Sequence, residues 1–145
     1  MVLPRLGWIK FLTIHCSGSP SGRGDTAADV CQWDRERFGQ PSYHFVIEEC
    51  GAVVTCLTTL EKGAHVGGHN AGNIGVCLIG GLDPLTREPN ATFTEAQYKS
   101  LKVLVAKFQL QYPGIQVFGH NEWPGVAKAC PCFSVKHWLK TGEAK

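Results

Sequence analysis

Three side chains that bind transition metals stand where predicted strands end or in the loop beyond them. His15 closes one apolar run, His120 follows another, and Cys130 lies in the loop that His120 begins. Two imidazoles and one thiolate can hold zinc and leave a fourth position for water. A histidine at a strand end is more often a hydrogen-bonded structural residue, so residue type and spacing alone leave both interpretations open.

The two histidines can meet only if their strands are neighbours in one sheet. Residues 9–16 form an apolar segment typical of a strand covered on both faces, and residues 115–118 form the last predicted strand. In open α/β sheets, sites gather beyond the carboxyl ends of the strands. This pattern places His15 and His120 at the same edge, provided that the topology makes their strands adjacent.

The long loop over residues 119–133 must then bring the thiolate back to the histidines. Proline and glycine punctuate this loop, so it can fold back on its own start, and Cys130 could then bind the same metal as His120. Cys132 is an alternative ligand two positions further on. Cys16 is not a partner for His15, because neighbouring side chains point to opposite faces of a strand.

The remaining pattern predicts an α/β fold: a single domain over residues 1–145, with a central mixed β-sheet of about five strands flanked by helices. The predicted elements besides the strands above are a helix from Thr26 to Phe38, a hairpin over residues 43–57, a strand at 74–79, a helix opened by Thr94 and a short helix capped by Ser134. In the first helix, the predicted buried stripe consists of Ala27, Val30, Trp33 and Phe38.

Composition narrows the class of protein. The 145 residues suffice for one core, and 43% hydrophobic with 18% charged residues is typical of a globular domain. A net charge of +2 argues against nucleic acid or an anionic membrane as the main partner. No run of about 18 apolar residues exists, and we expect no signal peptide at the start of the chain. We expect a monomer.

The cysteines do not indicate a disulfide framework. There are seven, an odd number, and no secretion signal accompanies them. We therefore expect most of those outside the loop and the first strand to be small buried apolar residues. This group consists of Cys31, Cys50, Cys56 and Cys77.

Four motifs carry a resemblance to a known family. The sequence resembles the zinc N-acetylmuramoyl-L-alanine amidases, which include phage lysozymes, the bacterial anhydro-muramyl amidases and the animal peptidoglycan recognition proteins. The motifs occur in the order typical of that family, and the resemblance runs from about residue 13 to residue 138. They are His15-Cys16-Ser17, Tyr43-His44-Phe45, residues 63–76 with their glycines and histidines, and His120 through Lys128-Ala129-Cys130-Pro131.

The resemblance implies one zinc ion per chain, held by His15, His120 and Cys130, and catalytic roles for Tyr43 and Lys128. The implied reaction is hydrolysis of the amide between N-acetylmuramic acid and L-alanine in bacterial peptidoglycan. Zinc in such a site lowers the pKa of water to roughly 7. Lys128 would stabilise the developing oxyanion and Tyr43 the attacking water or the tetrahedral intermediate. Either Tyr43 or a water would protonate the leaving amine.

Other residues of these motifs have less definite roles. We predict substrate contacts for His65 and Asn70, because the glycine-rich loop allows close approach of a ligand to the backbone. His44 is expected to be structural. Trp123 can stack on a sugar or pack in the loop core, and Glu122 can support the metal ligands or anchor the loop.

Three functions are compatible with these motifs. The first is a hydrolase, a phage endolysin that stays in the host cytoplasm until lysis and then acts on the cell wall. The second is a peptidoglycan-binding module that does not cut, which the presence of every implied ligand and catalytic residue disfavours. The third adds a partner to the first: the resemblance to phage lysozymes suggests a second role as an inhibitor of phage RNA polymerase.

Overall fold

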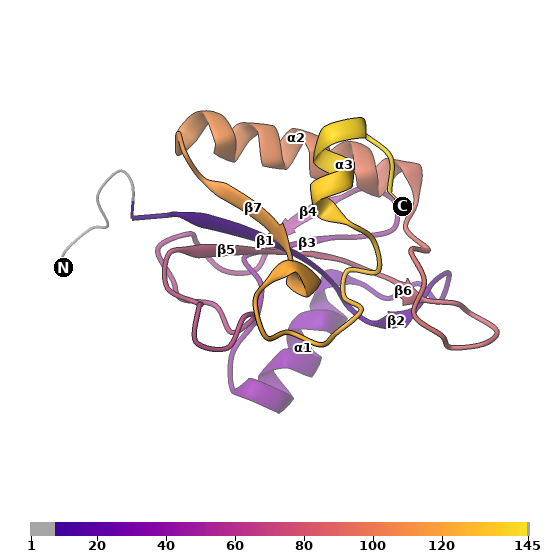
Figure 1. Cartoon of the computed structure of the whole chain (residues 1–145). Helices are drawn as coiled ribbons and strands as arrows, with labels where there is room; N and C mark the ends of the chain where they lie inside the picture. The colour runs from indigo at the N-terminus through magenta and orange to yellow at the C-terminus, as the bar shows by residue number, and fades with distance from the viewer. Residues whose placement is uncertain (1–7, 145) are drawn as a thin grey trace.

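The centre of the computed structural model, which describes residues 8–144, is a five-stranded sheet in the order β4-β3-β5-β1-β7 (Figure 1). Strand β1 pairs in parallel with β5 and β7, β3 pairs in parallel with β5, and β4 closes the hairpin in antiparallel orientation. This confirms the predicted mixed sheet. The strands are β1 (Phe11–Cys16), β3 (Phe45–Ile47), β4 (Val53–Thr55), β5 (Asn73–Leu78) and β7 (Gln116–Gly119); a separate parallel pair consists of β2 (Ser19–Pro20) and β6 (Gly81–Leu82).

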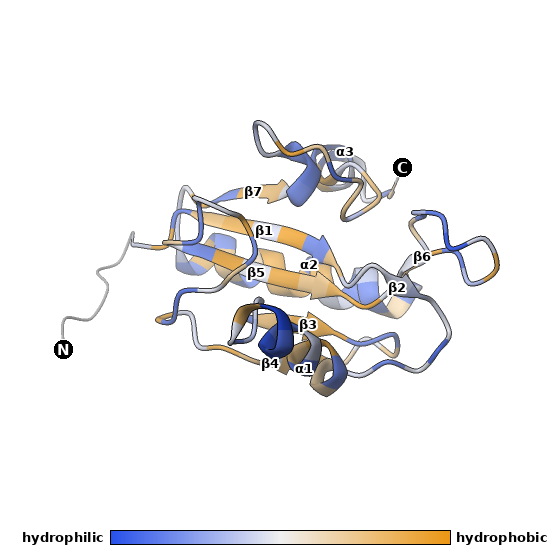
Figure 2. Ribbon diagram, turned by 90° about the horizontal axis from the view of Figure 1, so that it is seen from below, coloured by the Kyte–Doolittle hydropathy of each residue, from blue (hydrophilic) through white to orange (hydrophobic). Residues whose placement is uncertain are grey.

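The helices cover the sheet on both faces. Helix α1 (Ala27–Phe38) lies on one face, while α2 (Glu95–Gln111) and α3 (Val135–Thr141) lie on the other (Figures 1 and 2). A short 3-10 helix, η1 (His120–Glu122), follows β7 directly. The three-layer arrangement explains why β5, at the middle of the sheet, is buried along its whole length.

Two hydrophobic cores fill the space on either side of the sheet. The larger one lies under α2 and α3 and includes Leu12, Ile14, Val76, Leu101 and Phe108. The smaller one lies under α1 and consists of Ala27, Val30, Val46, Cys77 and Ile79. Residues that alternate along β5 therefore point into different cores, and the small core under α1 leaves room for polar side chains on that face.

Local sequence signals set the limits of the helices as predicted. Thr26 and Asp29 form a capping box at the start of α1, and Gly39 ends that helix in the left-handed conformation, at φ 79°. Thr94 and Gln97 form the capping box of α2. Gln97 is also fully buried, where its amide donates hydrogen bonds to the carbonyls of Ile47, in β3, and Ile79, just after β5.

Part of the predicted stripe on α1 is wrong. Ala27 and Val30 are buried, but Trp33 is 37% exposed and Phe38 is 50% exposed, while Cys31 is buried. The small core under α1 accommodates only a narrow apolar face, so the two bulky aromatic residues lie at its margin. The expected burial of cysteines also fails for Cys50, which is exposed, and for Cys56, which is half-buried.

Within residues 8–144, no helix is both long and apolar enough to cross a bilayer. The expectation about a signal peptide concerns the start of the chain, and residues 1–7 lie outside the described residues. That expectation, like the monomeric state, stays a prediction.

Candidate metal centre

The topology brings His15 and His120 together. Strands β1 and β7 are adjacent and parallel, with Ile14 opposite Gly119. The residue that follows Ile14 is His15, and the residue that follows Gly119 is His120. Their ring centroids lie 4.6 Å apart at the carboxyl edge of the sheet, which confirms the condition that the sequence left open.

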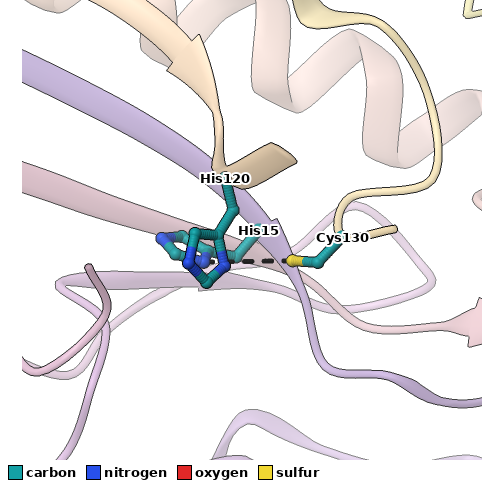
Figure 3. Close-up of side chains that lie close together, drawn as sticks. All are labelled: His15, His120 and Cys130. Carbon is teal, nitrogen blue, oxygen red and sulfur yellow. Dashed lines mark hydrogen bonds between the residues drawn. The ribbon is translucent and has the colours of Figure 1, made fainter. Parts of the chain in front are cut away.

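Cys130 reaches the same point because its loop folds back on η1. The backbone N–H of Asn121 donates to the carbonyl of Cys130 at 2.8 Å. The Cys130 sulfur then lies 3.9 Å from Nδ1 of His15 (Figure 3). Among residues 8–144, His15, His120 and Cys130 form the group whose ligand atoms all lie within 4.8 Å of one another.

A chain of hydrogen bonds fixes the tautomer of His15. Nε2 of His65 lies 2.9 Å from the carbonyl oxygen of Asn73, which only accepts, so this nitrogen must carry the proton. Nδ1 of His65 is then the acceptor for Nε2 of His15, at 2.9 Å. Nδ1 of His15 is left with a free lone pair that faces the cysteine sulfur, as a metal ligand requires.

The same network continues into the loop that carries His120. Asn73 accepts a hydrogen bond from the Thr13 hydroxyl at 2.8 Å, and that hydroxyl accepts one from the Trp123 indole at 3.0 Å. Trp123 is buried and packs edge-on against Phe11 and Phe118. Of the two interpretations of Trp123, the structure favours packing in the loop core.

A close approach at Gly75 makes room for this relay. A Cβ built on Gly75 would lie 2.9 Å from the His65 ring, closer than real Cβ atoms approach. Gly75 stands in the middle of β5, where a side chain would otherwise fill the sheet face. This glycine, inside an otherwise apolar strand, is the sequence signal that points to His65.

The protonation states suit a soft divalent cation. Burial and the neighbouring His65 hold the pKa of His15 well below 6.5, and burial also lowers the pKa of His120. The pKa of Cys130 is lowered chiefly by a hydrogen bond from the Cys16 thiol, and the Cys16 N–H donates to the same sulfur at 3.2 Å. Neutral imidazoles and a stabilised thiolate are the forms that bind zinc.

The structure disfavours Cys132 as the alternative ligand. Its thiol donates to the carbonyl of Gly81 at 3.4 Å. Among residues 8–144, the group whose ligand atoms lie close enough to hold one ion does not include Cys132. The donor set therefore contains one sulfur and two nitrogens, which fits zinc better than a hard, oxygen-binding cation.

His15, His120 and Cys130 line a cleft of about 370 Å³. Tyr43 and Lys128 line the same cleft, and the Tyr43 ring centroid lies 5.0 Å from that of His15. Burial raises the pKa of Tyr43 well above 10, so its phenol keeps its proton at neutral pH. Lys128 is exposed at the rim, and its charge contributes to the lowered pKa values of His15 and His120.

One wall of the cleft was not anticipated from the sequence. The exposed face of α1 contributes Trp33, Asp34, Arg37 and Phe38 to the lining. Burial raises the pKa of Asp34, which accepts a hydrogen bond from the Ser42 N–H. The signal in the sequence was the pair of aromatic residues that the small core cannot accommodate.

The two residues predicted to contact substrate lie in different places. His65 reaches the inner end of the cleft, but it is buried and both ring nitrogens bond to the protein. The side-chain oxygen of Asn70 accepts from the N–H groups of His65 and Val66, and Asn70 lines a separate pocket. These contacts give His65 a place beside His15 and make Asn70 an anchor of its loop. Contact of either residue with substrate stays a prediction.

Two further residues are structural. His44 is buried, accepts a hydrogen bond from the Gly75 N–H and contacts the carbonyl of Glu61 at 2.8 Å. The Glu122 carboxylate accepts from the N–H groups of Gly119 and Lys136, and so ties η1 to the start of α3. Glu122 is therefore a loop anchor, one of its two predicted alternatives.

Replacing His65 with alanine is expected to weaken zinc binding by roughly 10–100-fold, because the partner that orients His15 and fixes its tautomer is lost. The measurement is zinc affinity by competition with a chromophoric chelator. His69→Ala is the matched control, since His69 is an exposed histidine of the same loop that stacks on Trp123. Equal zinc affinities in the two variants would show that His65 does not orient His15 for metal binding.

The metal-free protein is expected to lose stability as the pH falls from about 6.5 to about 4. Folding lowers the pKa of His15, His44, His65 and His120, and burial, the main cause, brings that of His65 to about 4. Below pH 6.5 the unfolded chain therefore binds protons that the folded chain does not, and the free energy of unfolding declines. His65 alone should account for about 3 kcal/mol. The measurement is urea unfolding across this range, and a free energy of unfolding that does not change with pH would contradict these pKa shifts.

The fold and this site define a class of protein, and comparison with known sequences agrees. A family model described as N-acetylmuramoyl-L-alanine amidase matches residues 5–133. The chain belongs to this family.

Particular relatives narrow the class further. The endolysins of Klebsiella phage KP32 and Escherichia phage T7 are each 34% identical over 131 residues, which is 90% of this chain and 85% of theirs. Among solved structures, the Ph2119 endolysin from a Thermus scotoductus bacteriophage superposes with a TM-score of 0.71 at 18% identity, covering 90% of this chain and 80% of that one. The last likeness concerns the fold alone.

Proposed function

We propose that this amidase is a zinc enzyme that acts as a phage endolysin, hydrolysing the amide bond between N-acetylmuramic acid and the L-alanine of the stem peptide. The observation that carries the proposal is the convergence of Nδ1 of His15, His120 and Cys130 at the base of an open cleft. Such a site leaves a coordination position for substrate or water. The endolysin relatives support the biological role.

The residues around the ligands divide the work of catalysis. When bound, zinc supplies Lewis-acid polarisation and lowers the pKa of a water molecule. Lys128, at the rim, presents an ammonium group to the oxyanion that develops on the scissile carbonyl. Tyr43 keeps its phenolic proton and can donate it as a hydrogen bond at the reacting centre. The hydrogen-bonded His65 and Asn73 hold His15 in the ligating tautomer.

The wall formed by α1 suits a glycopeptide. Trp33 and Phe38 present aromatic surface, and Arg37 presents a guanidinium, beside the predicted ligands. Aromatic rings pack against sugar faces, and arginine pairs with carboxylates in a bidentate manner. A substrate that joins a sugar to an acidic peptide offers both kinds of group.

Digestion of purified sacculi tests the proposal. The zinc-loaded protein should release stem peptides with a free L-alanine amino group, a chelator should abolish the release, and added zinc should restore it. Binding to sacculi without release would instead identify the non-catalytic binding module.

The remaining expectations concern place and partners. As an endolysin, the protein would be made in the host cytoplasm and reach the wall at lysis. A role as inhibitor of phage RNA polymerase stays a prediction from the resemblance. A pull-down with a cognate single-subunit polymerase tests it, and failure to capture the polymerase at micromolar concentration would exclude this role.

A further inference from the structure

Two cysteines outside the metal centre lie in direct contact. The thiol of Cys31 points at the sulfur of Cys56, and the two sulfur atoms are 2.9 Å apart. Cys31 belongs to α1 and is buried, whereas Cys56 follows β4 and is half-buried. Neither residue lines the cleft that contains the metal ligands.

A helix on one side, and a backbone hydrogen bond with core packing on the other, hold the two sulfurs in this position. Cys31 lies in the interior of α1. The N–H of Cys56 donates to the carbonyl of His44 at 2.8 Å, and Cys56 packs against the small core under the helix. The contact therefore does not depend on a long loop that happens to bring the residues together.

The position of the pair gives it a consequence for the cleft. Helix α1 contributes Trp33 and Arg37 to the cleft wall, yet its buried residues are only Ala27, Val30 and Cys31. A covalent link at Cys31 would fasten the wall to the hairpin that follows Tyr43. It would also close a loop of chain in the unfolded state, which stabilises the folded one.

We propose that Cys31 and Cys56 are a modification site, which forms an intramolecular disulfide when the protein passes from a reducing to an oxidising compartment. The passage rests on the proposed endolysin function, but the chemistry does not. The thiolate of one cysteine attacks a small-molecule disulfide and expels one thiol; the second thiolate attacks the mixed disulfide and expels the other. Two protein thiols are oxidised, one external disulfide is reduced to two thiols, and the two protein protons pass to the departing sulfurs.

Burial and the contact with Cys31 raise the pKa of Cys56 to about 12. Only thiolates attack disulfides, so attack by Cys56 at neutral pH is slow. The redox poise of the surrounding thiols decides the state of the pair: it stays reduced where glutathione is reduced, and it closes on exposure to an oxidant.

Peptide mapping by mass spectrometry tests the proposal on the zinc-loaded full chain. The protein is incubated with oxidised glutathione in mildly alkaline buffer, and a parallel sample with a reductant. We expect a linked peptide containing Cys31 and Cys56, an intact mass lower by two hydrogens, and a melting temperature higher by roughly 5–10 °C. Cys50→Ser, which alters an exposed cysteine, should behave like the wild type, and Cys31→Ser and Cys56→Ser should each lose both effects.

Glutathione adducts at Cys31 or Cys56 without the linked peptide would overturn the proposal, as would two unmodified thiols after prolonged oxidation. A linked peptide without a rise in melting temperature would overturn the fastening of α1. Sacculus digestion by the reduced protein reads the proposed function separately, so failure of one experiment leaves the other interpretable.

Discussion

Cys130→Ser is expected to abolish stoichiometric zinc binding and amide hydrolysis together. The hydroxyl of serine is a hard, protonated donor at neutral pH and replaces the only sulfur of the proposed donor set. The loss in zinc affinity should exceed the roughly 10–100-fold that removal of an outer-shell partner costs. The measurement is zinc content after dialysis, together with the rate of stem-peptide release from sacculi.

Cys132→Ser is the matched control for this experiment. It makes the same chemical change two positions away, at a thiol that contacts the carbonyl of Gly81. This variant should keep one zinc per chain and most of its activity. Retention of zinc by Cys130→Ser, or its loss in Cys132→Ser, would show that the ligand set is wrong.

Lys128→Ala is expected to keep its zinc and to slow turnover by about a hundredfold to a thousandfold. Removal of a single group that stabilises a developing oxyanion typically has an effect of this size. Lys128 lies at the cleft rim and is exposed, so the substitution should leave folding intact. Steady-state kinetics on a soluble muramyl peptide would show the loss in kcat rather than in KM.

Lys136→Ala controls for the removal of one positive charge. Lys136 is an exposed residue of α3, away from the cleft, and only its backbone N–H contacts Glu122. Its rate should match that of the wild type. A full rate for Lys128→Ala would remove the oxyanion role and leave zinc as the principal stabilising group.

The sequence was most informative where a local rule determined the geometry. Parallel strands share a carboxyl edge, so apolar runs ending at His15 and His120 predicted two neighbouring imidazoles once β1 and β7 proved adjacent. Capping boxes at Thr26 and Thr94 located two helices for similarly local reasons. The return of Cys130 followed from the family resemblance, because no local rule fixes the path of a long loop.

The sequence was least informative where tertiary contacts decide. The place of His65 beside His15 is one example: Gly75 marks a close approach in β5, but the sequence does not show that the His65 ring fills the space. Trp33 and Phe38 fit a helical stripe, but the narrow core under α1 excludes them. The contact between Cys31 and Cys56 joins elements whose packing no periodicity reveals.

X-ray absorption at the zinc edge of the purified protein identifies the atoms that bind the metal. We expect one equivalent of zinc with a single sulfur at about 2.3 Å and its other ligands nitrogen or oxygen at about 2.0–2.1 Å. Absence of zinc, a spectrum without sulfur, or one with two or more sulfurs would contradict convergence of His15, His120 and Cys130 on one ion.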